Sequence, residues 1–163
     1  WSRGLGDVYK RQEDTCRAGD WYGVGFRDGT EGRTPDFLLT HARACNGYGI
    51  APARAPWEEG RQAGLPLYCT EDRAWREGAS GRRLSPVCPS RDLRRLALAN
   101  DLGQSHHRVE REIGETERRV TEISTRLADL PDGHPTRAGL IRERRDLRRD
   151  LVFLRDARWR YRL

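Results

Sequence analysis

A pattern of one aromatic residue and two glycines at helical spacing occurs three times in the first half of this 163-residue chain. Residues three or four apart share one face of a helix, and each glycine costs a helix about 1 kcal/mol relative to alanine. A stripe of glycines on one face is therefore expected where a neighbouring helix backbone comes unusually close. The alternative is that several of these glycines form helix C-caps and turns. The copies are Tyr22-x2-Gly25-x3-Gly29, Trp57-x2-Gly60-x3-Gly64 and Trp75-x2-Gly78-x2-Gly81, and their six glycines are the predicted helix-packing positions.

The four cysteines are widely spaced, at Cys16, Cys45, Cys69 and Cys88. Structural zinc sites usually contain a close pair of cysteines, whereas an even number at wide spacing in a small module is typical of disulfides in an exported protein. We therefore predict two disulfides, for which three pairings exist. If a helix at about 16–30 runs antiparallel to one at about 36–46, Cys16 meets Cys45. Cys69 would then bond to Cys88.

The composition indicates a small core and an all-α fold. Hydrophobic residues make up 36% of the chain and charged residues 34%, with a mean hydropathy of −0.90. No segment alternates with the two-residue period of a half-buried strand, and no apolar run approaches the roughly 20 residues that span a bilayer. We expect a disulfide-stapled helical module over residues 13–90 and an elongated helical segment over 91–163.

The first twelve residues resemble translated sequencing-adapter read-through rather than native protein. The chain contains no Met, and Lys10 is its only lysine. We exclude residues 1–12 from the fold prediction as an artefactual leader. The expectation is that a native export signal is missing from this chain.

Residues 91–163 carry an apolar repeat of 3.5 residues on both sides of a short loop near 131–135. Such a repeat predicts two helices folded back on each other as an antiparallel coiled-coil hairpin, with self-association through a further strand as an option. His106 and Arg158 interrupt the apolar seam at similar distances from the turn, so we expect them to face each other. The seam positions are Leu102, His106, Val109, Ile113, Thr116, Val120, Ile123, Leu127 and Leu130, then Leu140, Arg144, Leu147, Leu151, Leu154, Arg158 and Tyr161.

The positive charge of the chain lies in this second half. Residues 13–90 hold ten arginines and eleven acidic residues, a net of −1, whereas residues 91–163 hold eighteen and thirteen, a net of +5. Arginines beside Trp159 and Tyr161 could contact an anionic polymer or membrane surface; a solvated coiled-coil flank is the alternative. Nucleic acid is disfavoured because disulfides place the protein outside the cytoplasm. The arginines of the predicted anionic contact are Arg155, Arg158, Arg160 and Arg162.

An ordered set of residues in the cysteine module resembles the bacterial domain-of-unknown-function family 2799. It runs Cys16, Asp20-Trp21, Gly25-x2-Asp28-Gly29-x2-Gly32, His41-x3-Cys45-x3-Gly49, Gly60-Arg61-x2-Gly64-Leu65-x2-Tyr68-Cys69-Thr70, Gly78-x2-Gly81 and Cys88-Pro89. The resemblance implies a small exported protein, lipoprotein-like, in the periplasm or outer membrane. It implies no reaction and no cofactor.

Two further hypotheses concern chemistry. His41 and Cys45 are four residues apart on one helix face and could ligate a metal. Asp28 and Asp36 with His41 could form an acid–base set, although no nucleophile motif such as G-x-S-x-G accompanies them. The favoured prediction is a non-enzymatic structural or binding protein of the cell envelope with an unidentified partner. A metal-binding or hydrolytic protein centred on His41 and Cys45 is the alternative, and anionic-polymer binding by the C-terminal arginines is a third hypothesis.

Overall fold

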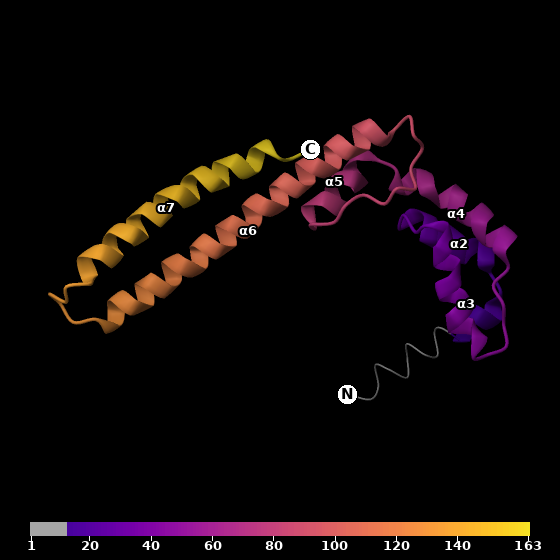
Figure 1. Cartoon of the computed structure of the whole chain (residues 1–163), viewed down its shortest axis with the longest axis horizontal. Coiled ribbons are helices and arrows are strands. Elements are labelled where there is room, and N and C mark those ends of the chain that lie inside the picture. The colour runs from indigo at the N-terminus through magenta and orange to yellow at the C-terminus, as the bar shows by residue number, and fades with distance from the viewer. Residues whose placement is uncertain (1–12) are drawn as a thin grey trace. The chain divides into compact units, whose positions relative to one another are not determined.

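A computed structural model describes residues 13–163, and all regular structure within that range is helical. The predicted all-α fold class is confirmed, while the predicted leader at 1–12 lies outside the described residues. Among residues 13–163, no helix combines the length and the apolar character needed to cross a bilayer. The elements in Figure 1 are a helical segment at 13–18, α2 (Trp21–Thr30), the 3-10 helix η1 (Pro35–Phe37), α3 (Leu38–Asn46), α4 (Arg54–Tyr68), α5 (Glu71–Ala79), α6 (Leu93–Asp129) and α7 (Arg137–Arg160).

The chain forms two compact units that do not divide where the sequence suggested. The first unit contains the described residues up to Arg73 together with Leu84–Leu96, and the second contains Ala74–Arg83 and Ala97–Leu163. The predicted division at residue 90 differs because the end of α5 packs on α6, which assigns those α5 residues to the unit of the long helices.

The predicted first helix at 16–30 is interrupted in the structure. Gly19 adopts a left-handed φ of +66°, which ends the first helical segment. Asp20 then caps α2, and its Oδ1 accepts a hydrogen bond of 2.8 Å from the Gly23 amide. A short acidic side chain at this position satisfies an amide that would otherwise lack a partner, so the restart is encoded locally.

The glycines of α2 and α4 bring the two helix backbones into direct contact. A Cβ added at Gly25, Gly29, Gly60 or Gly64 would overlap a carbonyl oxygen of the other helix. The residue numbers of the contacting pairs rise together along both helices, so α2 and α4 run in the same direction where they meet. The pairs are Gly25 with Trp57, Gly29 with Arg61, Gly60 with Tyr22 and Gly64 with Phe26.

Two helices that run in the same direction need a connection that returns to their common starting end. In the first unit this return is made by residues 31–53, and it brings Cys45 to Cys16, just before α2, with a Cα–Cα distance of 5.6 Å. Cys69, just before α5, bonds to Cys88, which precedes α6, at the same 5.6 Å. Both predicted disulfides are therefore present, in the pairing favoured from the sequence. The first bridge thus joins the segment between α2 and α4 to the start of α2. The second joins the segment between α5 and α6 to the start of α5.

The second unit contains a second glycine contact of the same design. Gly78 of α5 lies against the Asn100 carbonyl of α6, and Gly103 of α6 lies against the Trp75 carbonyl of α5. Gly103 was not among the predicted packing glycines. Gly81, which was, lies beyond the end of α5 with a φ of +77°, so its role is in the turn. There the His107 ring packs on the space that a Cβ would need.

The turns that follow α2 and α5 repeat the same hydrogen bonds. After α2, the Arg33 amide donates to the Asp28 carbonyl at 2.9 Å, and after α5, the Arg82 amide donates to the Glu77 carbonyl at 2.9 Å. The two segments read Asp-Gly-Thr-Glu-Gly-Arg and Glu-Gly-Ala-Ser-Gly-Arg. The helix pairs α2·α4 and α5·α6 are therefore two copies of one design.

Helices α6 and α7 lie side by side as an antiparallel hairpin (Figure 1). Near the turn they share an apolar cluster of Ile123, Leu127 and Leu140, with Leu130 and Leu147 packed against it. Further along, ion pairs join the helices. These are Arg119 with Glu143 at 2.8 Å, Arg155 with Glu117 at 2.8 Å and Arg158 with Glu110 at 3.2 Å.

His106 and Arg158 converge on one carboxylate at the open end of the hairpin. The Glu110 Oε1 atom lies 3.7 Å from His106 Nε2 and 3.2 Å from Arg158 Nη1. The two residues thus meet at Glu110 across the seam, in agreement with the prediction from their similar distances to the turn. His106 also packs edge-on against Trp75, with ring centroids 5.3 Å apart.

We predict that Gly64→Ala and Gly103→Ala each destabilise the protein by about 2 kcal/mol or more, because the added methyl group meets a backbone carbonyl that cannot move without separating the helices. Gly114→Ala is the matched control. Its Cβ would meet only Arg118 Nη1 at 3.8 Å, so the higher helix propensity of alanine should stabilise α6 by up to about 1 kcal/mol. Thermal unfolding followed by circular dichroism measures all three. Equal effects of Gly103→Ala and Gly114→Ala would contradict the contact.

Candidate functional site

Four polar side chains are buried within residues 13–163, and they occupy equivalent places in the two helix pairs. Asp28 and Glu77 each precede the packing glycine of the first helix, and both are 7% exposed. Arg61 and Asn100 each lie three residues before a packing glycine of the second helix, and they are 3% and 5% exposed. The buried polar groups therefore belong to the helix contacts themselves.

Arg61 and Asn100 make the same hydrogen bond in their respective pairs. Arg61 Nη1 donates to the Arg33 carbonyl at 3.0 Å, and Asn100 Nδ2 donates to the Arg82 carbonyl at 3.1 Å. Those carbonyls belong to the turns that follow α2 and α5. Each hydrogen bond joins the second helix of a pair to the turn that follows the first helix. It also gives a buried side-chain donor its partner.

In the first unit, Asp28 accepts hydrogen bonds from two other elements. Trp57 Nε1 of α4 donates to its Oδ2 atom at 2.8 Å, and His41 Nε2 of α3 lies 2.7 Å from the same atom. The His41 side chain is 23% exposed and also packs against the rings of Trp21 and Phe37. A carboxylate that orients a histidine occurs in catalytic sites, but here it also joins α2, α3 and α4 into one core.

Of the two chemical hypotheses, the acid–base set has Asp28 and His41 side by side in the structure, whereas the metal hypothesis loses its thiolate. Cys45 is bonded to Cys16, so it is not a thiolate ligand while that bridge is intact. His41 is directed to Asp28. Within the part of the chain that the structure describes, no three His, Cys, Asp or Glu side chains are grouped so that they could hold a metal ion.

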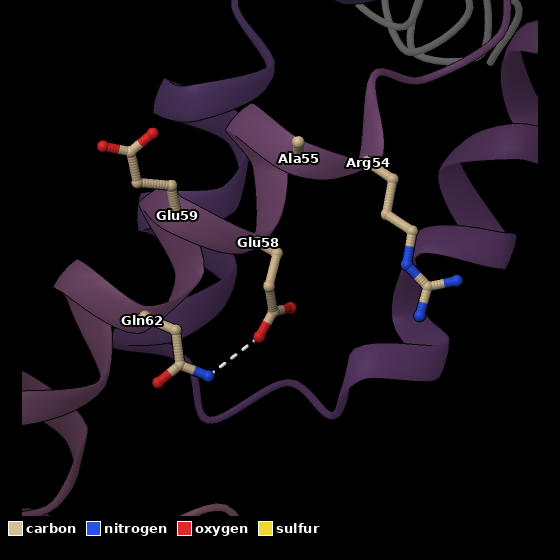
Figure 2. A pocket seen from close by; sticks show the side chains of 5 residues that line it. All are labelled: Arg54, Ala55, Glu58, Glu59 and Gln62. Carbon is tan, nitrogen blue, oxygen red and sulfur yellow. Dashed lines mark hydrogen bonds between the residues drawn. The ribbon is translucent and has the colours of Figure 1, made fainter.

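Arg61 is also held by a carboxylate on its own helix. Its Nε atom donates to Glu58 Oε2 at 2.9 Å and its Nη2 atom to Glu58 Oε1 at 2.7 Å. The hydrogen bonds from Arg61 hold the pKa of the Glu58 carboxyl below its ordinary value, although partial burial acts in the opposite direction. Figure 2 shows Glu58 directed toward Gln62, whose amide donates to it at 2.8 Å, in a shallow hollow also lined by Arg54, Ala55 and Glu59.

A second hollow, of about 430 Å³, lies over the Cys69–Cys88 bridge in the first unit. Its walls are about equally polar and apolar, and they include the charged side chains of Arg91 and Asp92. The hollow therefore lacks the predominantly apolar lining that is usual for a small-ligand site. The lining residues are Gln62, Leu65, Pro66, Cys69, Val87, Cys88, Pro89, Arg91 and Asp92.

The four arginines predicted to contact an anionic partner differ in their surroundings. Three already pair with carboxylates: Arg155 with Glu117, Arg158 with Glu110 and Arg160 with Asp156. Arg162 instead stacks on Trp159, with its guanidinium carbon 4.1 Å from the ring centroid.

Arg61, Glu77 and Asn100 were not identified as site residues from the sequence. One signal could have indicated Glu77. An acidic residue, a glycine, two further residues and Gly-Arg occur at 28–33 and again at 77–82. The partners across each contact could not be found in this way, because the local sequence does not show which two helices pack against each other.

Two pairs of helices cross at glycines. In each pair a disulfide lies at the start of the first helix, and buried polar side chains lie beside the crossing. These features define a small disulfide-bridged helical protein with an attached helical hairpin. The sequence pattern of the family described as "Protein of unknown function (DUF2799)" matches residues 20–105. This is more than half of the chain, and the chain belongs to that family. The match includes α2, α4, α5 and the first part of α6, where the glycine contacts lie. No curated protein and no solved structure matches the chain.

We predict that acid weakens the α2·α4 contact through Glu58. Because the folded-state pKa of Glu58 is lowered, its contribution to stability is present above the ordinary carboxyl pKa of about 4.3 and is lost as the pH falls through the folded-state value. Glu58→Gln should therefore lower stability at neutral pH and reduce the loss of stability in acid. Chemical denaturation between pH 3 and 7 measures this, with Glu59→Gln as the neighbouring control. An acid dependence unchanged in Glu58→Gln would contradict the assignment.

Proposed function

We propose that this chain is a non-enzymatic structural or binding protein of the bacterial cell envelope, working in an oxidising compartment. The observation that carries the proposal is the pair of disulfides. They occur at equivalent places in two copies of one helix pair, where each joins the start of the first helix to the segment that connects it to the second. Disulfides persist in exported proteins and are rare in the reducing cytoplasm. A duplicated design that uses a bridge in both copies favours a protein that normally folds where bridges form.

The Cys16–Cys45 bridge is part of a small apolar cluster in the first unit. The buried members of this cluster are Cys16, Trp21, Val24, Cys45 and Trp57. Two of these five residues are the bridge itself. A disulfide that closes a loop of 19 or 29 residues contributes on the order of 3 kcal/mol, which is a large fraction of the net stability of a small domain.

A structural or binding role is supported by how the buried polar groups are used. Asp28, Arg61 and Asn100 hydrogen-bond to groups that hold helices and turns together. A reacting group needs an accessible face toward a substrate. These groups instead serve the helix contacts, and the proposal therefore assigns function to surfaces rather than to a buried centre.

Attachment through an N-terminal lipid belongs to the same proposal and rests on the resemblance to lipoprotein-like members of the family. It predicts that the full gene product, expressed in its bacterial host, incorporates radiolabelled palmitate and fractionates with the envelope. Label confined to other proteins would remove the lipid anchor from the proposal without affecting the oxidising location.

We predict that all four cysteines are oxidised in the cell. Cells expressing the full gene product would be quenched in acid, and the protein would be denatured and treated with a polyethylene-glycol maleimide. The expected result is no mass shift without reductant and a shift of four adducts after reduction. Four adducts without reduction would refute an oxidising location. A quadruple Cys→Ser variant should be destabilised, because both bridges are lost.

A second candidate function is binding of an anionic partner by the basic end of the hairpin. One observation favours it. Helix α7 contains nine arginines and four acidic residues, a net of +5, whereas α6 contains seven of each. The intramolecular partner of α7 therefore does not neutralise it overall, and the surplus is available to a negatively charged surface.

A further inference from the structure

Helix α7 carries a second apolar stripe that α6 does not cover. Ile141, Val152 and Trp159 are 46%, 64% and 57% exposed. At about 100° per residue they lie within about 40° of one another around the helix. Leu140 and Leu151, which are buried in the seam, lie on a different side. One face of α7 thus packs within the hairpin, and another presents large apolar side chains to solvent.

Arginines fill and flank this outer stripe. With Ile141, Val152 and Trp159 they continue the alternating spacing of four and three residues, at Arg145, Arg148 and Arg155. Arg148 is exposed, and Arg155 pairs with Glu117 of α6. Phe153 and Leu163 add exposed apolar surface nearby, at 66% and 62%. The face therefore combines bulky apolar groups with positive charge along its whole length.

The charge of this face limits what can cover it. A second copy of the chain would oppose one helix of net charge +5 to another, or to α6, which has no net charge. Neither arrangement supplies the missing negative charge. The partner must itself be anionic and must also accept apolar side chains.

We propose that the outer face of α7, defined by Ile141, Arg145, Arg148, Val152 and Trp159, docks on an anionic lipid bilayer surface. Trp is suited to the headgroup region because its ring is apolar and its N–H is polar. Arginine stems can lie along the apolar boundary while their guanidinium groups reach the phosphates. The stripe from Ile141 to Trp159 spans about 27 Å at 1.5 Å per residue, so the helix would lie flat on the surface.

This inference rests on the second candidate function and names its partner. It is preferred over an acidic protein or polymer because the apolar members of the stripe are large and strongly exposed. A polyanion in water would contact the arginines and leave Val152 and Trp159 exposed. A bilayer surface covers both kinds of group at once.

The test is flotation of the full chain with phosphatidylcholine vesicles containing or lacking phosphatidylglycerol. The expected result is binding only to the anionic vesicles, weakened by salt. Arg145→Glu/Arg148→Glu should reduce the partition coefficient by at least roughly tenfold, because each positive charge near such a surface contributes appreciably. Arg118→Glu/Arg126→Glu on α6 makes the same change in net charge and should retain clearly more binding.

A second pair of variants tests the apolar part of the face. Val152→Ser/Trp159→Ser should lower the partition coefficient by about tenfold or more, because a Trp and a Val no longer enter the interface. Leu67→Ser/Leu98→Ser, which alters residues that are 60% and 63% exposed on α4 and α6, should change it little. Circular dichroism verifies that each variant remains folded.

Several outcomes would overturn the inference. Equal binding by the two charge-reversed variants would reduce it to adsorption by net charge. Retention on polyglutamate or heparin without vesicle binding would reject the lipid partner and leave the second candidate function standing. A dimer in analytical ultracentrifugation that Val152→Ser/Trp159→Ser abolishes would assign the stripe to self-association. None of these results bears on the oxidation state of the cysteines, which tests the envelope location separately.

Discussion

The direct contact of helix backbones at paired glycines is the constraint on which this structure depends. Where a Cβ is absent on both helices, the carbonyl of each can lie against the α-carbon of the other. Contacts of this kind gain dispersion energy over many atoms but tolerate no added methyl group. The arrangement explains why the chain retains glycines inside helices, where each lowers helix propensity.

That contact determines the rest of each helix pair. Because the two helices cross in the same direction, the chain must return to the starting end, and the return segment can be bonded there by a cysteine. Because the backbones are close, polar side chains beside the glycines are buried and must be satisfied. Asp28 and Arg61 meet this requirement in the first pair, and Glu77 and Asn100 occupy the equivalent places in the second. Disulfides, buried polar groups and capped turns are thus consequences of one packing choice.

The two copies differ where their surroundings differ. Trp57 of the first pair donates a hydrogen bond to Asp28. The equivalent position in the second pair, four residues before Asn100, is Leu96, whose side chain has no hydrogen-bond donor. Glu77 pairs instead with Arg82 at 2.6 Å, at the end of its own helix. The first copy therefore uses its acidic residue to join three helices into a core. In the second copy the acidic residue pairs with Arg82, and the second helix continues into the hairpin.

The sequence by itself determined the features that depend on local spacing. The heptad repeat predicted the hairpin and the facing of His106 and Arg158, and the cysteine spacing predicted the two bridges. It did not determine that Gly103 is a packing glycine, because Leu96 stands where the pattern has an aromatic residue and Ala99 where it has its first glycine. Nor did it show that Gly81 lies in a turn or that Trp57 reaches Asp28, 29 residues away. Spacing along one helix states which face is small or apolar, but the helix that meets this face, and the direction in which it runs, are decided only when the whole chain packs.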